Sequence, residues 1–352
     1  MLLGALATAA IAVIAVIAAG GGGGGGSKTT TTGAPKTPTP ARTVPAGRAA
    51  PRPGRQGVRR GRGKRPDVPA PGTGALLGIA DQKAATFSDP LFRNLGVVRS
   101  RLNTPWNSIF TEPRRLAEWL DAARAAGVEP LVAFEHARGE PCPAQPCTLP
   151  SVGTYSRAVA AFHRAYPWVK LLQPWNEANS ATQPTGQHPE RAAAYYAAVT
   201  RVCPACVVTG ADVLDSTNLA RWLGRFRAAT GTATPQLWGL HNYSDTNRFR
   251  DQGTKQMLAL VPGQVWLTEA GGIVSFKTAD GRVALPYDVQ RAARAIRYLF
   301  SLADSSPRIT RVYIYQWKID FPGNRFDAGL VGLDGRARPA LTAVLQKRSL
   351  LR

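Results

Sequence analysis

From residue 73 to residue 352, short apolar runs alternate with longer segments in which apolar residues recur every three or four positions. The short runs have the length and composition of buried strands, and the longer segments have the periodicity of amphipathic helices. The expected strands are Ala75–Ala80, Gly96–Leu102, Pro130–Phe134, Val169–Gln173, Val207–Ala211, Gln236–His241, Gln264–Thr268 and Arg311–Trp317. Helices are expected at Pro113–Ala126, Val152–Ala165, Pro189–Arg201 and Asp288–Leu302, among others.

Strands that alternate with helices eight times predict an α/β fold, a (β/α)8 TIM barrel, for residues 73–352. The length of this segment suits one large domain with a substantial core. An open, doubly wound sheet is the alternative. It is less well supported because Gly78-Ile79-Ala80-Asp81-Gln82 stands where such a fold carries a glycine-rich phosphate loop.

Residues 1–19 are apolar from Leu2 onward except for Gly4 and Thr8, although no Lys or Arg precedes them. Such a segment predicts a secretory signal peptide or a membrane anchor. We expect cleavage after the small residues near Ala19, with an uncleaved anchor as the alternative. Either outcome predicts a secreted or surface-anchored protein.

Residues 20–72 are rich in Gly, Thr, Pro and Arg, and they offer almost no apolar surface to bury. We therefore expect a disordered linker. It contains eleven basic residues and one acidic residue, a net charge of +10 out of +22 for the chain. The linker could be a solvated tether, or it could dock on an anionic cell-wall polymer or membrane surface. Nucleic-acid binding is disfavoured because no aromatic residues are interleaved with the arginines.

Glu177 and Glu269 each end an apolar, strand-like run. In a barrel, the C-terminal ends of the strands meet at one rim, so these two carboxyl groups can face each other. Glycoside hydrolysis needs this arrangement, because one group protonates the leaving oxygen and the other attacks or activates water.

Further polar and aromatic residues fall at the same expected strand ends. Arg, Tyr and His can hold a carboxylate ionised and oriented, while indole rings stack on sugars. The candidates are Arg99, Arg101, Trp106, Glu135, His136, His241, Tyr243 and Trp317. We favour Arg101 over Arg99 as the neighbour of a catalytic carboxylate.

These residues resemble those of the clan A, or "4/7", glycoside hydrolases. Trp175-Asn176-Glu177 is similar to the Asn-Glu pair of their fourth strand, and Glu269 in Trp-Leu-Thr-Glu is similar to the nucleophile of their seventh. His241-Asn242-Tyr243 resembles the His-x-Tyr of strand six, and Trp317 resembles the aromatic of strand eight. The resemblance covers about residues 75–345, including Asp327-Ala328-Gly329-Leu330 and Arg338-Pro339-Ala340 near the end. Ala178 departs from it, because many relatives carry proline there.

The resemblance implies a retaining glycosidase acting on a polysaccharide or oligosaccharide. Glu269 would be the nucleophile, Glu177 the acid/base, and Asn176 a ligand of the sugar 2-hydroxyl. Arg101 and Tyr243 would keep Glu269 ionised. No metal or cofactor is required, the partner is a carbohydrate substrate, and we expect a monomer.

Two alternatives come from other classes of function. The barrel could be catalytically inactive and bind a cell-surface glycan, or the protein could be a basic adhesin whose barrel is only a scaffold. Intact Glu177 and Glu269 argue against the first alternative.

The four cysteines form two close pairs along the sequence. Cys142 and Cys147 follow the expected third strand, while Cys203 and Cys206 precede the fifth, at the opposite end of a barrel. A single zinc site would have to span the barrel, and a redox role does not suit Cys203 and Cys206 because they do not open a helix after a strand. In an exported protein, two local disulfides are expected, with free thiols as the alternative.

Overall fold

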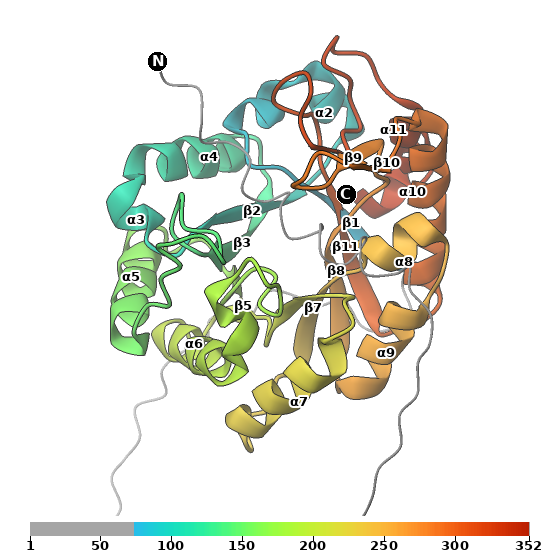
Figure 1. Ribbon diagram of the computed structural model, residues 1–352. Coiled ribbons are helices and arrows are strands. Elements are labelled where there is room, and N and C mark those ends of the chain that lie inside the picture. The colour runs from blue at the N-terminus through green and yellow to red at the C-terminus, as the bar shows by residue number, and fades with distance from the viewer. Residues whose placement is uncertain (1–73, 352) are drawn as a thin grey trace, which may run out of the picture. The chain divides into compact units, whose positions relative to one another are not determined.

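The computed structural model describes residues 74–351, which form a barrel of parallel strands surrounded by helices (Figure 1). The expected signal segment (1–19) and linker (20–72) lie outside the described residues. Within residues 74–351, none of the helices is long and apolar enough to cross a membrane. The barrel strands are β1 (Leu76–Ala80), β2 (Arg99–Pro105), β3 (Glu129–Glu135), β4 (Leu171–Gln173), β5 (Val207–Val208), β6 (Asp212–Leu214), β7 (Leu237–His241), β8 (Gln264–Ala270) and β11 (Ile309–Tyr315).

The strands pair in parallel in the order β5-β4-β3-β2-β1-β11-β8-β7-β6. The edge strands β5 and β6 are consecutive in the chain, so they are two halves of one fifth strand. Between them, the Thr209 amide donates a hydrogen bond to the Leu172 carbonyl of β4 (3.1 Å), and the Gly210 amide donates one to the Leu237 carbonyl of β7 (2.7 Å). These bonds join the two edges of the sheet and close it into a barrel. With β5 and β6 counted as one strand, the expected eight-stranded barrel is confirmed.

The fifth strand differs from the sequence-based expectation, which made Val207–Ala211 continuous. The chain is interrupted there at residues 209–211. A Cβ atom on Gly210 would lie 2.4 Å from two ring atoms of Pro235. Only glycine therefore lets the backbone pass this close to the proline ring while it bridges β4 and β7.

Helices surround the strands, and the four expected ones are present with nearly the expected bounds. The α-helices are α2 (Pro90–Leu95), α3 (Ser108–Thr111), α4 (Pro113–Ala125), α5 (Val152–Ala165), α6 (Pro189–Val202), α7 (Leu219–Thr230), α8 (Tyr243–Arg248), α9 (Gln252–Leu260), α10 (Val289–Asp304) and α11 (Pro339–Leu345). Three short 3-10 helices are η1 (Ala84–Ser88), η2 (Pro184–Gln187) and η3 (Arg348–Leu351). Helix α10 shows why these segments are helical. The Asp288 carboxylate caps its N-terminus by accepting from the amides of Gln290 (2.9 Å) and Arg291 (2.8 Å).

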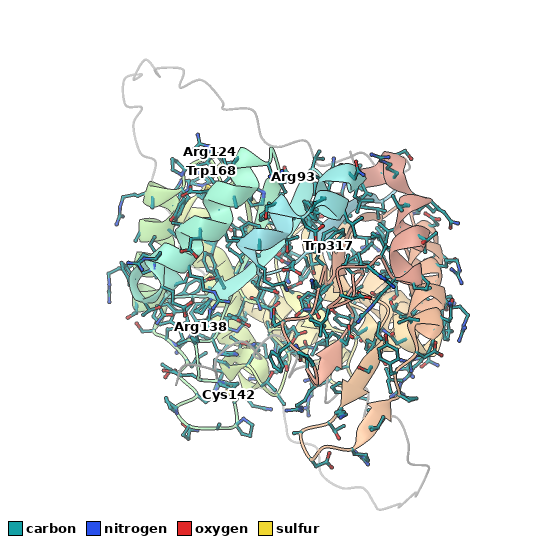
Figure 2. All side chains as sticks on the ribbon, turned by 90° about the horizontal axis from the view of Figure 1, so that it is seen from above. Arg93, Arg124, Arg138, Cys142, Trp168 and Trp317 are labelled. Carbon is teal, nitrogen blue, oxygen red and sulfur yellow. A yellow bond between two sulfur atoms is a disulfide. The ribbon has the colours of Figure 1, made fainter. Side chains whose placement is uncertain are left out.

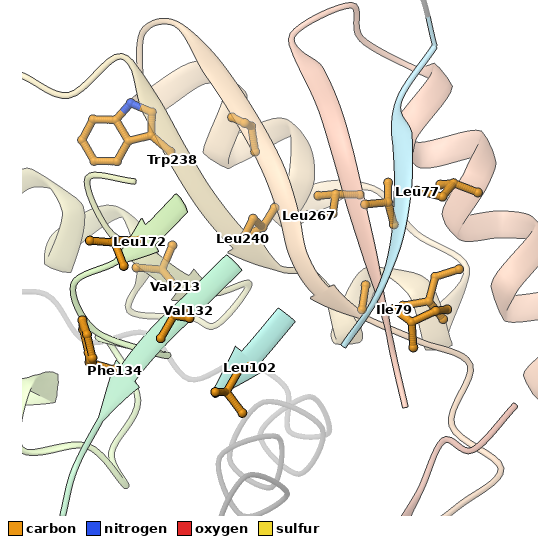
Figure 3. Packing of buried hydrophobic residues seen from close by; sticks show 14 of the residues in the cluster. Leu77, Ile79, Leu102, Val132, Phe134, Leu172, Val213, Trp238, Leu240 and Leu267 are labelled. Carbon is orange, nitrogen blue, oxygen red and sulfur yellow. The ribbon is translucent and has the colours of Figure 1, made fainter. Parts of the chain in front are cut away.

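The strands contribute alternate residues to two buried clusters. On β8, Val265 and Leu267 pack in the larger cluster with the helices, while Trp266 packs in a second cluster that includes Leu131 and Tyr313. Figure 3 shows part of the larger cluster, built from strand residues all around the barrel. This alternation follows from the two-residue period of a strand, and it leaves inward-facing positions available for polar groups.

The loops after β8 and β11 carry a second, small sheet. It consists of β9 (Ser275–Lys277), β10 (Val283–Leu285) and β12 (Phe326–Asp327), paired antiparallel in the order β10-β9-β12. Because both loops leave the C-terminal ends of their strands, this sheet lies over the rim where the two glutamates are expected.

Both expected disulfides are present, Cys142–Cys147 and Cys203–Cys206. The first lies in the loop after β3, and the second lies between α6 and β5, so they are at opposite ends of the barrel. Figure 2 shows Cys142 and Arg138 toward one end, and Arg124 with Trp168 toward the other.

The close approach at Gly210 gives a stability prediction. Gly210→Ala should destabilise the fold by about 1–3 kcal/mol, because the added methyl group overlaps the Pro235 ring. Gly224→Ala is the matched control, since a Cβ there meets nothing within 4 Å and the site lies in the exposed face of α7. The control should be neutral or stabilising by about 0.5–1 kcal/mol. Urea unfolding measures both, and equal effects would contradict the packing explanation.

Candidate active site

The two glutamates meet at the C-terminal ends of the strands. Glu269 lies in β8, and Glu177 lies in the segment that follows β4. One carboxyl oxygen of each, together with a ring nitrogen of His241, all lie within 4.8 Å of one another. All three side chains are buried. The barrel thus brings together the two carboxyl groups that the sequence singled out.

The backbone around Glu177 is bonded to both neighbouring strands. The amide of Asn176 donates to the Phe134 carbonyl of β3 (2.6 Å), and the amide of Ala178 donates to the Asp212 carbonyl of β6 (2.8 Å). Between them, Glu177 has a φ of 45°, in the left-handed region that non-glycine residues rarely adopt. Such strain persists where the surroundings enforce it, and here hydrogen bonds to β3 and β6 hold the backbone on either side of Glu177.

Glu269 is held by one hydrogen bond to each carboxyl oxygen. Arg101 Nη1 donates to Oε2 (2.6 Å), and the Tyr243 hydroxyl donates to Oε1 (3.1 Å). Of the two candidate arginines, Arg101, which the sequence analysis favoured, is the one that contacts Glu269. Burial raises the pKa of Tyr243 well above its usual value, and the charge of Glu269 raises it further, so the hydroxyl remains a donor.

Arg101 is completely buried and makes four strong contacts. Besides Glu269, it donates to Gln173 Oε1 (2.6 Å), Asn176 Oδ1 (2.6 Å) and Asp212 Oδ2 (2.8 Å). Burial alone would lower its pKa, but the nearby carboxylates of Asp212 and Glu269 outweigh this and raise it. The guanidinium is therefore a fixed positive charge.

Asp212 is a functional residue that the sequence analysis missed. It accepts from Arg101 and from the Thr268 hydroxyl, and its Oδ2 lies 3.1 Å from His241 Nε2. Burial would raise its pKa, but the positive charges of His241 and Arg101 lower it to about 2. A signal was present, because Asp212 directly follows the expected fifth strand, the same kind of position that identified Glu177.

His241 connects Asp212 to Glu177. Its Nδ1 lies 3.1 Å from Glu177 Oε1, and its Nε2 makes an ion-pair contact with Asp212 Oδ2 (3.1 Å). Burial would lower the pKa of His241, but Asp212 and Glu269 raise it to about 10. The ring is thus an imidazolium that donates to Glu177.

Glu177 is the titratable member of the cluster. Burial raises its pKa to about 7, against the lowering effect of His241, while Glu269 and Asp212 raise it further. Its Oε2 has no hydrogen-bond partner among the described residues. A carboxyl group with one oxygen bonded to a cation and the other unoccupied can carry a proton on the second oxygen and give it up.

The prediction for Trp317 is wrong. Its indole packs edge-on against Phe92 of α2 (5.3 Å between ring centres) and donates to Asp89 Oδ2 (3.0 Å). The indole nitrogen is therefore not bonded to Glu177 or Glu269. The aromatic residue on this strand that faces the site is Tyr315, whose pKa is raised by burial and by the charge of Glu269. The error is one of register, because Tyr315 ends β11 and Trp317 lies two residues beyond it.

Trp106 and His136 lie at the rim without a hydrogen bond to either glutamate. The Trp106 ring packs near Tyr155 (6.5 Å between centres). His136 Nδ1 contacts the Ala137 carbonyl (2.8 Å), and its amide donates to Gln183 (3.3 Å). Their expected role in substrate binding remains a prediction.

An aromatic residue of the small sheet packs against Tyr243, the hydrogen-bond partner of Glu269. The Phe326 ring of β12 lies edge-on to Tyr243 (5.6 Å between centres), and Tyr315 and Phe276 are each 6.0 Å away. This packing shields the hydrogen bond between Tyr243 and Glu269 from water, which strengthens it.

Glu177, His241 and Glu269 are close enough to consider as metal ligands. Their electrostatics do not suit that role, because His241 is an imidazolium and both oxygens of Glu269 already accept hydrogen bonds. Neutral imidazole is what a metal requires. The other close set, His163 with Cys203 and Cys206, contains sulfur atoms that are joined in a disulfide.

Comparison with known proteins shows the fold. No protein-family model matches the chain, and no curated protein sequence matches it significantly. Solved structures do match. A family 39 glycoside hydrolase from Bacteroides cellulosilyticus WH2 has 18% identity and a TM-score of 0.53, with 76% of this chain and 62% of that chain covered. The chain thus spans less than two thirds of that enzyme.

For two other structures, the match with this chain extends over most of that protein's length. A GH5_18 protein from Streptomyces cattleya, in complex with GlcNAc, has 17% identity and a TM-score of 0.54, with 79% of this chain and 80% of that chain covered. A GH10 endoxylanase from a sugarcane soil metagenome has 13% identity and a TM-score of 0.57, with 78% and 97% covered. At 13–18% identity these matches show the fold, a TIM barrel that this chain shares with glycoside hydrolases of GH39, GH5 and GH10. The resemblance read from the sequence is confirmed at this level.

Proposed function

We propose that this protein is a retaining glycoside hydrolase. One observation carries the proposal: two buried carboxyl groups have oxygens within 4.8 Å of each other and entirely different partners. Retaining enzymes hold their carboxyl groups about 5–5.5 Å apart, whereas inverting enzymes leave about 6.5–9.5 Å for a water molecule. The fold shared with the glycoside hydrolases supports the same activity.

In the first step, a Glu269 oxygen attacks the anomeric carbon as the bond from that carbon to the leaving oxygen breaks. Glu177 Oε2 donates its proton to the leaving oxygen, and a covalent glycosyl-enzyme results. Arg101 and Tyr243 stabilise the attacking carboxylate and orient it. Asn176, whose Oδ1 accepts from Arg101, can donate through Nδ2 to a sugar hydroxyl.

In the second step, ionised Glu177 takes a proton from water, and the hydroxide attacks the same carbon from the opposite side of the bond to Glu269. Glu269 leaves as a carboxylate, and the two inversions give net retention. The His241 imidazolium stabilises Glu177 while it is ionised. Its contact with Asp212 keeps the imidazolium charged throughout the cycle.

Replacement of the two glutamates tests the assignment. Glu269→Ala should abolish turnover without unfolding the barrel. Glu177→Ala should slow substrates with poor leaving groups by about 10²–10⁴-fold, and activated aryl glycosides far less, because these need little protonation. Glu118→Ala, on the exposed face of α4, is the control. NMR of the first-formed product should show the substrate's anomeric configuration. An inverted product would rule out the mechanism.

The pKa of Glu177 predicts the alkaline limb of the pH profile. The first step needs protonated Glu177, and its pKa is raised to about 7, so kcat/KM should fall as the pH rises above about 7. Steady-state assays with a substrate that has a poor leaving group measure this limb. Glu177→Gln, which cannot ionise, should lack it. A wild-type profile that stays flat well above pH 7 would contradict the assignment of Glu177 as the acid.

We also propose that the protein is exported and that residues 20–72 attach it to an anionic surface. The +10 charge of this segment and the two disulfides support the proposal. Deleting residues 20–72 should remove sedimentation with anionic lipid vesicles at low salt and leave soluble turnover unchanged. Equal sedimentation of both proteins would contradict the tether, and an absence of turnover in both proteins would favour the adhesin alternative.

A further inference from the structure

Basic residues gather at the end of the barrel opposite the catalytic rim, where the strands begin and the helices finish. Among residues 74–351, five helices that run toward this end carry an exposed arginine and no acidic residue in their last turn. These residues, which define the basic end, are Arg93 of α2, Arg124 of α4, Arg164 of α5, Arg201 of α6 and Arg227 of α7. Figure 2 shows Arg93 and Arg124 at the end away from Arg138 and Cys142.

The partners of these arginines leave their charge in place. Arg93 Nε donates to the Phe87 carbonyl (3.2 Å), and Arg227 Nη1 donates to the Leu260 carbonyl (2.5 Å). Arg124 lies over the ring of Trp168, 5.3 Å from its centre. A carbonyl group or an aromatic ring attracts a guanidinium without cancelling its charge. Within the described part of the chain, none of the five arginines forms a salt bridge with a carboxylate.

The carboxylates near this end do not balance the arginines. Glu129 is paired with Arg311 (2.8 Å), and Asp304 is paired with Lys347 (3.4 Å). Asp121, one turn before Arg124 in α4, is left to offset the five arginines. The basic end therefore carries an excess of positive charge.

The catalytic rim differs, because cations and carboxylates are paired there. Three ion pairs lie in the loops at the C-terminal ends of the strands. They are Lys83–Asp320 (3.3 Å), Arg138–Glu112 (2.7 Å) and Arg338–Asp327 (2.9 Å). The rim thus combines both signs of charge, whereas one sign prevails at the basic end.

Helix stability explains part of this arrangement, since a cation near the C-terminus of a helix interacts favourably with the helix dipole. It does not explain Lys170, which lies in no helix and directly precedes β4 at the same end. Like charges that are not compensated also repel one another. An anionic partner would remove that repulsion.

The arrangement of the arginines suits a flat anionic surface. They come from successive outer helices around the barrel, so a linear polyanion would reach only those along its path, whereas a plane meets them together. Trp168, which is partly exposed beside Arg124, belongs to the residue types enriched at membrane–water interfaces. Near an anionic bilayer, each Lys or Arg strengthens binding by about fivefold.

The chain also enters the barrel at this end. Gly74 lies two positions before β1, and a Cβ atom on it would lie 3.5 Å from Leu350 of η3. Arg348 of the same short helix donates to the carbonyl of Asn94, the neighbour of Arg93 in α2. The linker of residues 20–72, with its net charge of +10, is therefore joined to the barrel at the basic end.

From these observations we infer that the basic end docks on an anionic lipid surface, with the catalytic rim facing away from it. The inference rests on the proposed tether, which it extends from the linker to the barrel, and not on the proposed hydrolysis. The linker captures the surface, and the basic end, held close to it, acts as a second contact. A carbohydrate would then reach the rim from the side away from the lipid.

Two matched triple variants test the docking. The protein used is residues 20–352, the chain that cleavage near Ala19 would leave, so that the apolar segment cannot insert into lipid. One variant carries Arg124→Gln, Arg164→Gln and Arg201→Gln. The control carries the same change at three exposed arginines of the rim loops and of the start of α4, which are Arg114, Arg282 and Arg336.

Binding is measured by sedimentation with vesicles of phosphatidylglycerol and phosphatidylcholine in equal amounts, at about 0.1 M salt. The basic-end variant should bind about 10–100-fold more weakly than the wild type, while the control should stay within about threefold of it. Equal weakening of both variants would show that only the net charge matters and would overturn the inference. So would wild-type binding by the basic-end variant.

Hydrogen exchange of the protein without these substitutions measures the orientation directly. On the same vesicles, the turns that follow α4, α5 and α6 (residues 124–128, 163–170 and 203–206) should exchange more slowly. Residues 278–282 of the rim should exchange as they do in solution. Slower exchange at the rim, or no change at the basic end, would contradict the proposed orientation.

Two further outcomes separate this inference from its alternatives. If deleting residues 20–72 removes binding while both triple variants bind like the wild type, the tether survives and the docking of the barrel is overturned. If soluble polyphosphate binds through Arg124, Arg164 and Arg201 but vesicles do not bind, the basic end recognises a linear polyanion, and the lipid surface is overturned.

Discussion

The Arg101 guanidinium is the buried charge around which the site is organised. An unpaired cation inside a protein is very unfavourable, so Arg101 requires anionic and polar partners on every side. It obtains them from β4, β6, β8 and the segment after β4, through Gln173, Asp212, Glu269 and Asn176. These strands lie at different positions around the barrel. One side chain therefore fixes the relative positions of most residues at this rim.

The same charges give the two glutamates different properties. Glu269 contacts Arg101 and Tyr243 directly, so its negative charge is compensated on both oxygens. Among residues 74–351, the Glu177 carboxyl group has a hydrogen bond only with His241, whose positive charge is shared with Asp212. At Glu177 the effect of burial therefore outweighs the lowering effect of His241, and the pKa is raised to about 7. Two identical side chains a few ångströms apart thus stand in different electrostatic environments, as the proposed nucleophile and acid require.

Much of this could be read from the sequence, because barrel strands are short apolar runs and their ends are where polar residues first appear. Glu177, Glu269, Arg101, His241 and Tyr243 were all found in this way. Asp212 was not, although it directly follows the expected fifth strand, because it belongs to none of the motifs on which the resemblance rests. Trp317 was misplaced because counting along a strand cannot show that β11 stops at Tyr315. Contacts between loops, such as Lys83 with Asp320, have no local pattern at all.

The buried charge network and the surrounding loops differ in how well they tolerate substitutions. The charge network is built from strand residues and the segment after β4, and each member neutralises another, so replacing one leaves a buried charge unpaired. The loops after β1, β2, β3 and β11 are different, because Gln82, Glu112, Arg138 and Asp320 are partly exposed. Substitutions of partly exposed loop residues cost less stability, so these loops can vary while the buried network is preserved.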